Sequence, residues 1–206
     1  MAEQFEFRSG CGTRDAVFIC KRLIEQCHNS KDSSLIFLAL DWAKAFDSID
    51  PACLFQSLRR FGLPEKYLHV ISNIYTNREF VVVDHRQKSQ SHQQVFGISQ
   101  GCPLSPFLFV MLMTVLLHDA NVLLQQEFPN NETSIECNEL VYADDTLLIG
   151  RDTAYLQAYM NFIAQVGKTY GLSLNWKKVE QMNIKCQDMH IYSLDGDVIQ
   201  IKECSK

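Results

Sequence analysis

The cysteines of this sequence lack any arrangement that would hold a metal or a disulfide framework. There are eight, none forms a CxxC pair, and no histidine stands at zinc-site spacing from them. They are scattered through apolar stretches, where free cysteine behaves as a small buried hydrophobe. The N-terminus also lacks the basic start and apolar segment of a secretory signal. We therefore expect an intracellular protein, nuclear or cytoplasmic and not secreted.

Long apolar runs are also missing. The longest, residues 103–117, is shorter than the ~20 residues of a membrane span and carries Ser105, Pro106 and Thr114. It predicts a buried core helix and no association with a membrane. No internal repeat and no low-complexity stretch interrupts the 206 residues, which suit one domain.

Positive charge is in short supply, since the net charge is -5 and the pI about 5.7. Binding to phosphates needs Lys and Arg, so the balance argues mildly against tight nucleic-acid binding by this chain alone. Apolar residues make up 47%, enough for a folded core.

The residues that are present predict a mixed order of elements. Asp50 as N-cap and Pro51 at the first turn begin one helix, which ends near Gly62, and Gly171 ends another. The 34–40 run is short and apolar, as in a buried strand. Expected helices cover 14–27, 51–62, 64–77, 103–126 and 152–170; expected strands cover 34–40, 139–142 and 146–149; expected hairpins join 80–83 to 94–96 and turn at 195–197; a surface loop is expected at 130–134. This pattern predicts an α+β fold with an antiparallel sheet packed on helices.

Three acidic residues stand in apolar surroundings. Asp41 ends the 34–40 run, and Asp144 and Asp145 lie between two short apolar strands. Buried carboxylates need a partner or a metal. If the strands are neighbours, the three carboxylates converge at one end of the sheet, where they could hold Mg²⁺. The plainer alternatives are a strand-end residue for Asp41 and an ordinary hairpin turn for the other two.

Ordered segments resemble the motifs of reverse transcriptases. Residues 37–47 (FLALDWAKAFD) resemble motif A as found in non-LTR retrotransposons and group II introns, and residues 97–106 (GISQGCPLSP) resemble motif B. Residues 142–145 (YADD) match motif C, and residues 171–180 (GLSLNWKKVE) resemble motif D. Residues 4–16 (QFEFRSGCGTRDA) resemble the fingers segment before motif A. One tetrad would be weak, but the ordered set identifies the chain as a member of this family.

The resemblance implies a role for each matching acid and lysine. Asp41, Asp144 and Asp145 would be catalytic and would bind two Mg²⁺ ions, for which Mn²⁺ is a possible substitute. Lys178 would match the motif D lysine, a candidate proton donor to pyrophosphate. The alternative for Lys178 is an ordinary solvated lysine.

The resemblance also implies a substrate pocket. Phe46 would exclude a 2′ hydroxyl, unless it is simply a core aromatic, and Gln100 and Gly101 would line the nucleotide and template pocket. Gly101 would also serve the entry to the following helix. Tyr142 would pack beneath the site, and Arg8 would reach phosphate or remain a surface charge.

The implied architecture is a polymerase palm at 34–206 with a fingers-like insertion at about 51–96, preceded by a partial fingers segment at 1–33; a thumb is expected to be missing. Glu6, Ser9 and Cys11, together with Ser99 and Val179, depart from common family residues but remove no metal ligand.

The implied activity is RNA-directed DNA synthesis with an RNA template, a DNA or RNA primer and deoxynucleoside triphosphates. A catalytically silent remnant that binds nucleic acid or protein is the alternative, while RNA-templated RNA synthesis fits Phe46 less well and a nucleotide cyclase would not call for motifs B and D.

Overall fold

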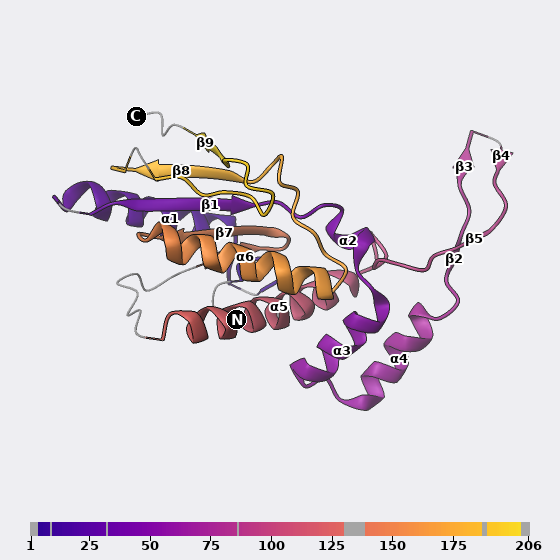
Figure 1. Cartoon of the computed structure of the whole chain (residues 1–206). Coiled ribbons are helices and arrows are strands. Elements are labelled where there is room, and N and C mark those ends of the chain that lie inside the picture. The colour runs from indigo at the N-terminus through magenta and orange to yellow at the C-terminus, as the bar shows by residue number, and fades with distance from the viewer. Residues whose placement is uncertain are drawn as a thin grey trace.

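The computed structural model describes residues 4–8, 10–31, 33–85, 87–129, 139–186 and 189–202. A five-stranded sheet forms its centre, in the order β6-β7-β1-β8-β9 (Figure 1). The strands are β1 (Leu35–Leu40), β6 (Glu139–Tyr142), β7 (Asp145–Gly150), β8 (Glu180–Ile184) and β9 (Gln200–Lys202). The neighbours are antiparallel except for the parallel pair β8–β9. The predicted α+β class is confirmed.

Helices cover both faces of this sheet, because the central strand β1 is apolar on both sides. Ile36 and Leu38 face the large core formed with α5 (Ser105–Glu127) and α6 (Thr153–Thr169). Leu35 and Phe37 face the smaller cluster under α1 (Thr13–Asn29). This alternation is the period of two expected of a strand.

Helix α5 has the length and composition to cross a membrane, but half of its most apolar window is buried inside the protein. Phe109 and Leu112 are fully buried in the large core. The predicted role of a core helix is therefore confirmed, and this helix begins two residues later than expected.

The capping residues place the other helices as predicted. Asp50 accepts a hydrogen bond from the amide of Ala52 at 2.7 Å, and Gly62 has a φ of +94° after α3 (Pro51–Phe61). Gly171, with a φ of +80°, follows the last residues of α6. The short α2 (Ala45–Ser48) and α4 (Glu65–Tyr75) complete the helical set of the described residues.

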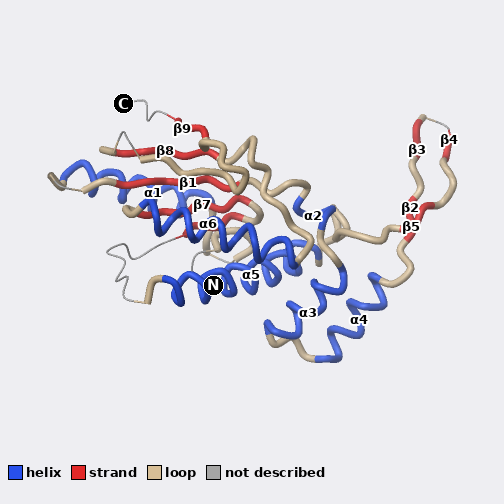
Figure 2. Tube along the Cα trace, viewed as in Figure 1, coloured by secondary structure: helices blue, strands red, loops and turns tan. Residues whose placement is uncertain are grey.

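A long hairpin, the arm (residues 79–93), leaves the body after α4 (Figures 1 and 2). Its ladders are short: β2 (Glu79–Phe80) pairs with β5 (His92–Gln93), and β3 (Val83–Asp84) with β4 (Gln87–Lys88). The prediction of one hairpin joining 80–83 to 94–96 was wrong in its pairing. Val95 and Phe96 lie outside any strand and are 63% and 56% exposed, so no buried face fixed the register.

The tail forms part of the expected hairpin. Tyr192 and Val198 make one antiparallel bridge, and the amide of Ser193 donates to the carbonyl of Asp197 at 2.8 Å. The chain then enters β9, which pairs parallel with β8 and was not predicted. The loop expected at 130–134 lies outside the described residues.

Candidate active site at the sheet end

Strand pairing brings the three predicted acids to one end of the sheet. Leu40, the last residue of β1, is opposite Thr146 in an antiparallel ladder, so Asp41 follows at the level of Asp145. Tyr142 pairs with Asp145 across the neighbouring ladder, which leaves Ala143 and Asp144 as the turn. The antiparallel register therefore brings the three carboxylates together, as expected if the strands were neighbours. We call β6, β7 and this turn the carboxylate hairpin.

The carboxylates of this site repel one another electrostatically. Burial raises the pKa of Asp145 above its usual value, and the charges of Asp144 and then Asp41 raise it further. Burial, Asp144 and Asp145 raise the pKa of Glu6 in the same order. Glu6 is thus a fourth carboxyl group near the site, which stood out in the sequence only as a departure from the family pattern.

These oxygens suit a hard divalent cation, because a bound cation relieves the repulsion between them. Asp41, Asp144 and Asp145 are the residues that could hold it. Within the described residues no group of three or more His, Cys, Asp or Glu side chains already has the spacing of a metal cage. The arrangement fits Mg²⁺, which keeps several waters and takes substrate phosphates as ligands instead of requiring an all-protein cage.

The segment after α6 places Lys178 beside Asp41. The amide of Asn175 donates to the carbonyl of Asp41 at 2.8 Å, and Trp42 bridges Leu174. The ammonium of Lys178 then lies 3.5 Å from the carboxylate of Asp41, although its side chain is 67% exposed. Such an exposed pair adds little stability, and the lysine remains free to meet a bound anion.

The predicted substrate pocket is built from two segments. An open pocket of about 550 Å³ is lined by Phe46, Gln100, Gly101, Cys102, Pro103, Ser105 and Pro106. The ring of Phe46 stacks on Phe109, with centroids 4.7 Å apart. The side-chain amide of Gln100 donates to Asp47 at 3.2 Å. The pocket therefore lies between α2, which carries Phe46 five residues beyond Asp41, and the segment that leads into α5.

Gly97 allows these two segments to touch. Its amide donates to the carbonyl of Ile49 at 2.8 Å, and the next amide, of Ile98, donates to the carbonyl of Phe46 at 2.7 Å. A Cβ on Gly97 would lie 2.8 Å from backbone atoms of Asp47, and its φ is +82°. By contrast, Gly101 has the same φ but open space around its Cβ position. Gly97, which we did not predict as a site residue, is therefore the glycine that requires close backbone approach.

Arg78, at the base of the arm, holds the same loop from the other side. Its guanidinium donates to the carbonyl of Gly97 at 2.6 Å and to the hydroxyl of Ser99 at 2.8 Å. It also lies over the ring of Tyr75, 4.2 Å from the centroid. Nothing in the sequence marked this arginine, because its partners are up to 21 positions away.

Of the two remaining predicted residues, Tyr142 is part of the carboxylate hairpin and Arg8 belongs to the N-terminal segment beside it. Tyr142 is half-buried in the cluster under α1 and lines a mainly apolar hollow of about 270 Å³ that also contacts Asp145. Arg8 is exposed and donates to the carbonyl of Gln4 at 3.0 Å.

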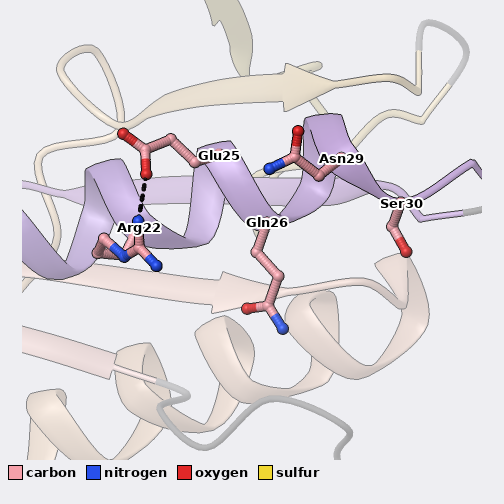
Figure 3. Close-up of a pocket in the computed structure, with 5 residues that line it drawn as sticks. All are labelled: Arg22, Glu25, Gln26, Asn29 and Ser30. Carbon is pink, nitrogen blue, oxygen red and sulfur yellow. Dashed lines mark hydrogen bonds and ion pairs between the residues drawn. The ribbon is translucent and has the colours of Figure 1, made fainter.

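A more polar hollow lies on the last turns of α1, lined by Arg22, Glu25, Gln26, Asn29 and Ser30 (Figure 3). Arg22 and Glu25 form an ion pair there at 2.6 Å. This end of the helix precedes β1, whereas the acids follow β1, so the hollow belongs to the opposite end of the sheet.

Comparison with known proteins agrees with this geometry. The sequence model described as "Reverse transcriptase (RNA-dependent DNA polymerase)" matches residues 1–196. This chain belongs to the reverse transcriptase family. Its relatives include the Pol polyprotein of the retrotransposable element R2DM from Drosophila melanogaster, which is 29% identical over 78% of the chain, and a transposon TX1 protein from Xenopus laevis, 25% identical over 80%. This reverse transcriptase domain is of the non-LTR type, as the motifs predicted.

The chain covers only 15% and 12% of the length of these two relatives. Among solved structures, apo telomerase from Candida tropicalis, truncated from its C-terminal domain, superposes with a TM-score of 0.66 over 86% of this chain and 36% of that one, at 16% identity. A second structure of apo telomerase from Candida tropicalis gives a TM-score of 0.63 over 97% of this chain and 37% of that one, at 13% identity. These likenesses show a shared reverse transcriptase fold.

Proposed function

We propose that this chain is the polymerase core of an RNA-directed DNA polymerase, which adds deoxynucleotides to a primer 3′ end on an RNA template. The observation that carries the proposal is the convergence of Asp41 with Asp144 and Asp145 at one end of the sheet. The pocket between α2 and the start of α5, and the ordered motifs around it, support the same activity.

The chemistry divides between bound ions and the chain's own residues. When bound, two Mg²⁺ ions would activate the primer hydroxyl and stabilise the leaving pyrophosphate. Asp41, Asp144 and Asp145 would hold and orient them. Lys178, 3.5 Å from Asp41, would meet the negative charge of pyrophosphate and donate a proton to it.

Pocket residues would select the substrate. Phe46 is held against Phe109, so its ring presents a fixed wall to the sugar and would exclude a 2′ hydroxyl. Gln100, oriented by Asp47, would contact the nucleotide or the template. The template and primer would be held through their backbones and shape.

Primer extension on an RNA template with Mg²⁺ and deoxynucleotides tests this proposal. Asp144→Asn should lower extension by at least about 100-fold, because it removes a metal ligand and with it the charge stabilisation that the ion would supply at the reacting phosphate. Asp84→Asn, on the exposed arm, is the matched control and should extend like the parent. Circular dichroism would show that all three proteins are folded. Equal extension by Asp144→Asn would overturn the metal-ligand assignment; a folded parent that extends nothing would favour the silent remnant.

A second substitution separates DNA from RNA synthesis. Phe46→Ala should raise the incorporation of ribonucleotides relative to deoxynucleotides by about 10-fold or more, because a missing steric wall forfeits discrimination. Phe80→Ala, an exposed aromatic on the arm, is the control. Unchanged sugar discrimination in Phe46→Ala would refute the role of this ring as a gate.

A further inference from the structure

The N-terminal segment is joined to the carboxylate hairpin by more than packing. Gln4 bridges Val141 in parallel fashion at the free edge of β6, and the amide of Phe5 donates to the carbonyl of Val141 at 2.9 Å. The side chain of Gln4 is only 1% exposed. Its Oε1 accepts a hydrogen bond from the amide of Ala143 at 3.2 Å and another from the amide of Glu6 at 2.9 Å.

The first of these bonds reaches the turn that carries Asp144. Ala143 has a φ of +53°, in the left-handed region that an alanine rarely adopts. Such a strained conformation persists only where the surroundings hold it in place. The Gln4 oxygen is one group that holds it, because it binds the amide of the strained residue itself.

The NH₂ group of the Gln4 side chain indicates that the role of this residue lies in its oxygen. Its Nε2 is buried and has no hydrogen-bond partner among the described residues. Leaving a buried amide donor unpaired has a cost in stability, because the group loses its hydrogen bonds to water on folding. Flipping the amide would not help, since it would set the NH₂ group against two N–H donors. An apolar residue would avoid this cost but would leave the amides of Ala143 and Glu6 without an acceptor.

We propose that Gln4 is a positioning residue of the active site: its Oε1 fixes the amide of Ala143 and so holds Asp144 and Asp145 in their metal-binding arrangement. The effect of Gln4 on metal binding rests on the proposed function. The hydrogen bond itself stands on the geometry of the turn.

Amide hydrogen exchange in the full chain tests the bond directly. The amide of Ala143 should exchange at least about 10-fold more slowly in the parent than in an unprotected turn. Gln4→Met, which keeps the length of the side chain but removes the acceptor, should abolish that protection. Should this variant fail to fold, the parent decides: an Ala143 amide that exchanges at the unprotected rate overturns the proposal.

Titration with Mn²⁺ alone, followed by electron paramagnetic resonance, tests the consequence. Loss of a partner that orients metal ligands typically weakens metal binding about 10-fold or more, so Gln4→Met should bind Mn²⁺ more weakly by that factor. Gln181→Met is the matched control. Gln181 is also fully buried, and its amide bonds to the backbone of Met189 and Ile191, but it lies on β8, separated from the carboxylate hairpin by β1. It should lower stability yet leave Ala143 exchange and Mn²⁺ binding unchanged.

The outcomes separate the two ideas. A parent that binds Mn²⁺, with a folded Gln4→Met variant unchanged in both measurements, would remove Gln4 from the site and leave the proposed function standing. A parent that binds no Mn²⁺ would count against the proposed function, while Ala143 exchange would still decide the role of Gln4.

Discussion

The carboxylate hairpin and the arm are two hairpins of similar sequence character and opposite surroundings. Both contain runs of valine, leucine, isoleucine or aromatic residues. In the first, Leu148 and Ile149 are fully buried and a four-pair ladder joins the strands. In the second, Val82 and Val83 are more than half exposed and each ladder has only two pairs. β-propensity alone therefore does not make a core strand, since burial on a face supplies the packing that fixes register.

The largest difference between the hairpins should appear when one side chain is shortened in each. Leu148→Ala should lower the free energy of unfolding by about 2–5 kcal/mol, because it leaves a cavity in the core. Val82→Ala on the arm should change it by less than about 0.5 kcal/mol. Urea denaturation of both variants measures the contrast. Equal losses would mean that the arm is buried in solution and would break the comparison.

A smaller effect is expected where the arm returns to the body. Gly97→Ala should cost about 2–4 kcal/mol, since it adds a close backbone contact to the strain of a positive φ. Gly101→Ala shares the positive φ without the contact and should cost about 1–2 kcal/mol. Thermal unfolding of the pair gives the difference, which is the energetic weight of the contact with Asp47. No difference would show that the loop relaxes freely.

The smallest contrast concerns ion pairs and pH. Arg60 on α3 donates two hydrogen bonds to Asp119 on α5, at 2.5 and 2.6 Å, and these hold the pKa of Asp119 below its usual 3.8. The pair therefore stabilises the fold above pH 3.8, and this stability is lost as the pH falls through the lowered pKa. Asp119→Asn should cost about 1 kcal/mol at pH 7, and the difference from the parent should vanish in acid.

The control for this pair is Asp84→Asn on the arm, where Asp84 and His85 are 85% and 93% exposed. It should have no measurable effect on stability at pH 7. Denaturant midpoints across the pH range test both variants. A difference for Asp119→Asn that persisted below the lowered pKa would refute the ionic origin of its contribution.

The contrast between the buried carboxylate hairpin and the exposed arm also explains which elements could be predicted. The helix limits near Asp50, Gly62 and Gly171 followed from caps, which act within a few residues. The strands beside the three acids followed from short apolar runs that adjoin those acids. The pairing of the arm could not be predicted, because its exposed strands have no buried face to fix the register. The bonds of Arg78 to Gly97 and Ser99 could not be predicted either, because they join residues up to 21 positions apart.

The sequence by itself determined the long helices, the strands beside the acids, the family and three candidate acids, because propensities, caps and motifs are local properties. Only the tertiary structure decided that Asp41 lies level with Asp145, that Glu6 joins them, and that Gln4 binds the amide of Ala143 across 139 positions of chain. Those contacts arise when strands and edges that are distant in sequence pair and exclude water, which makes their polar groups find partners.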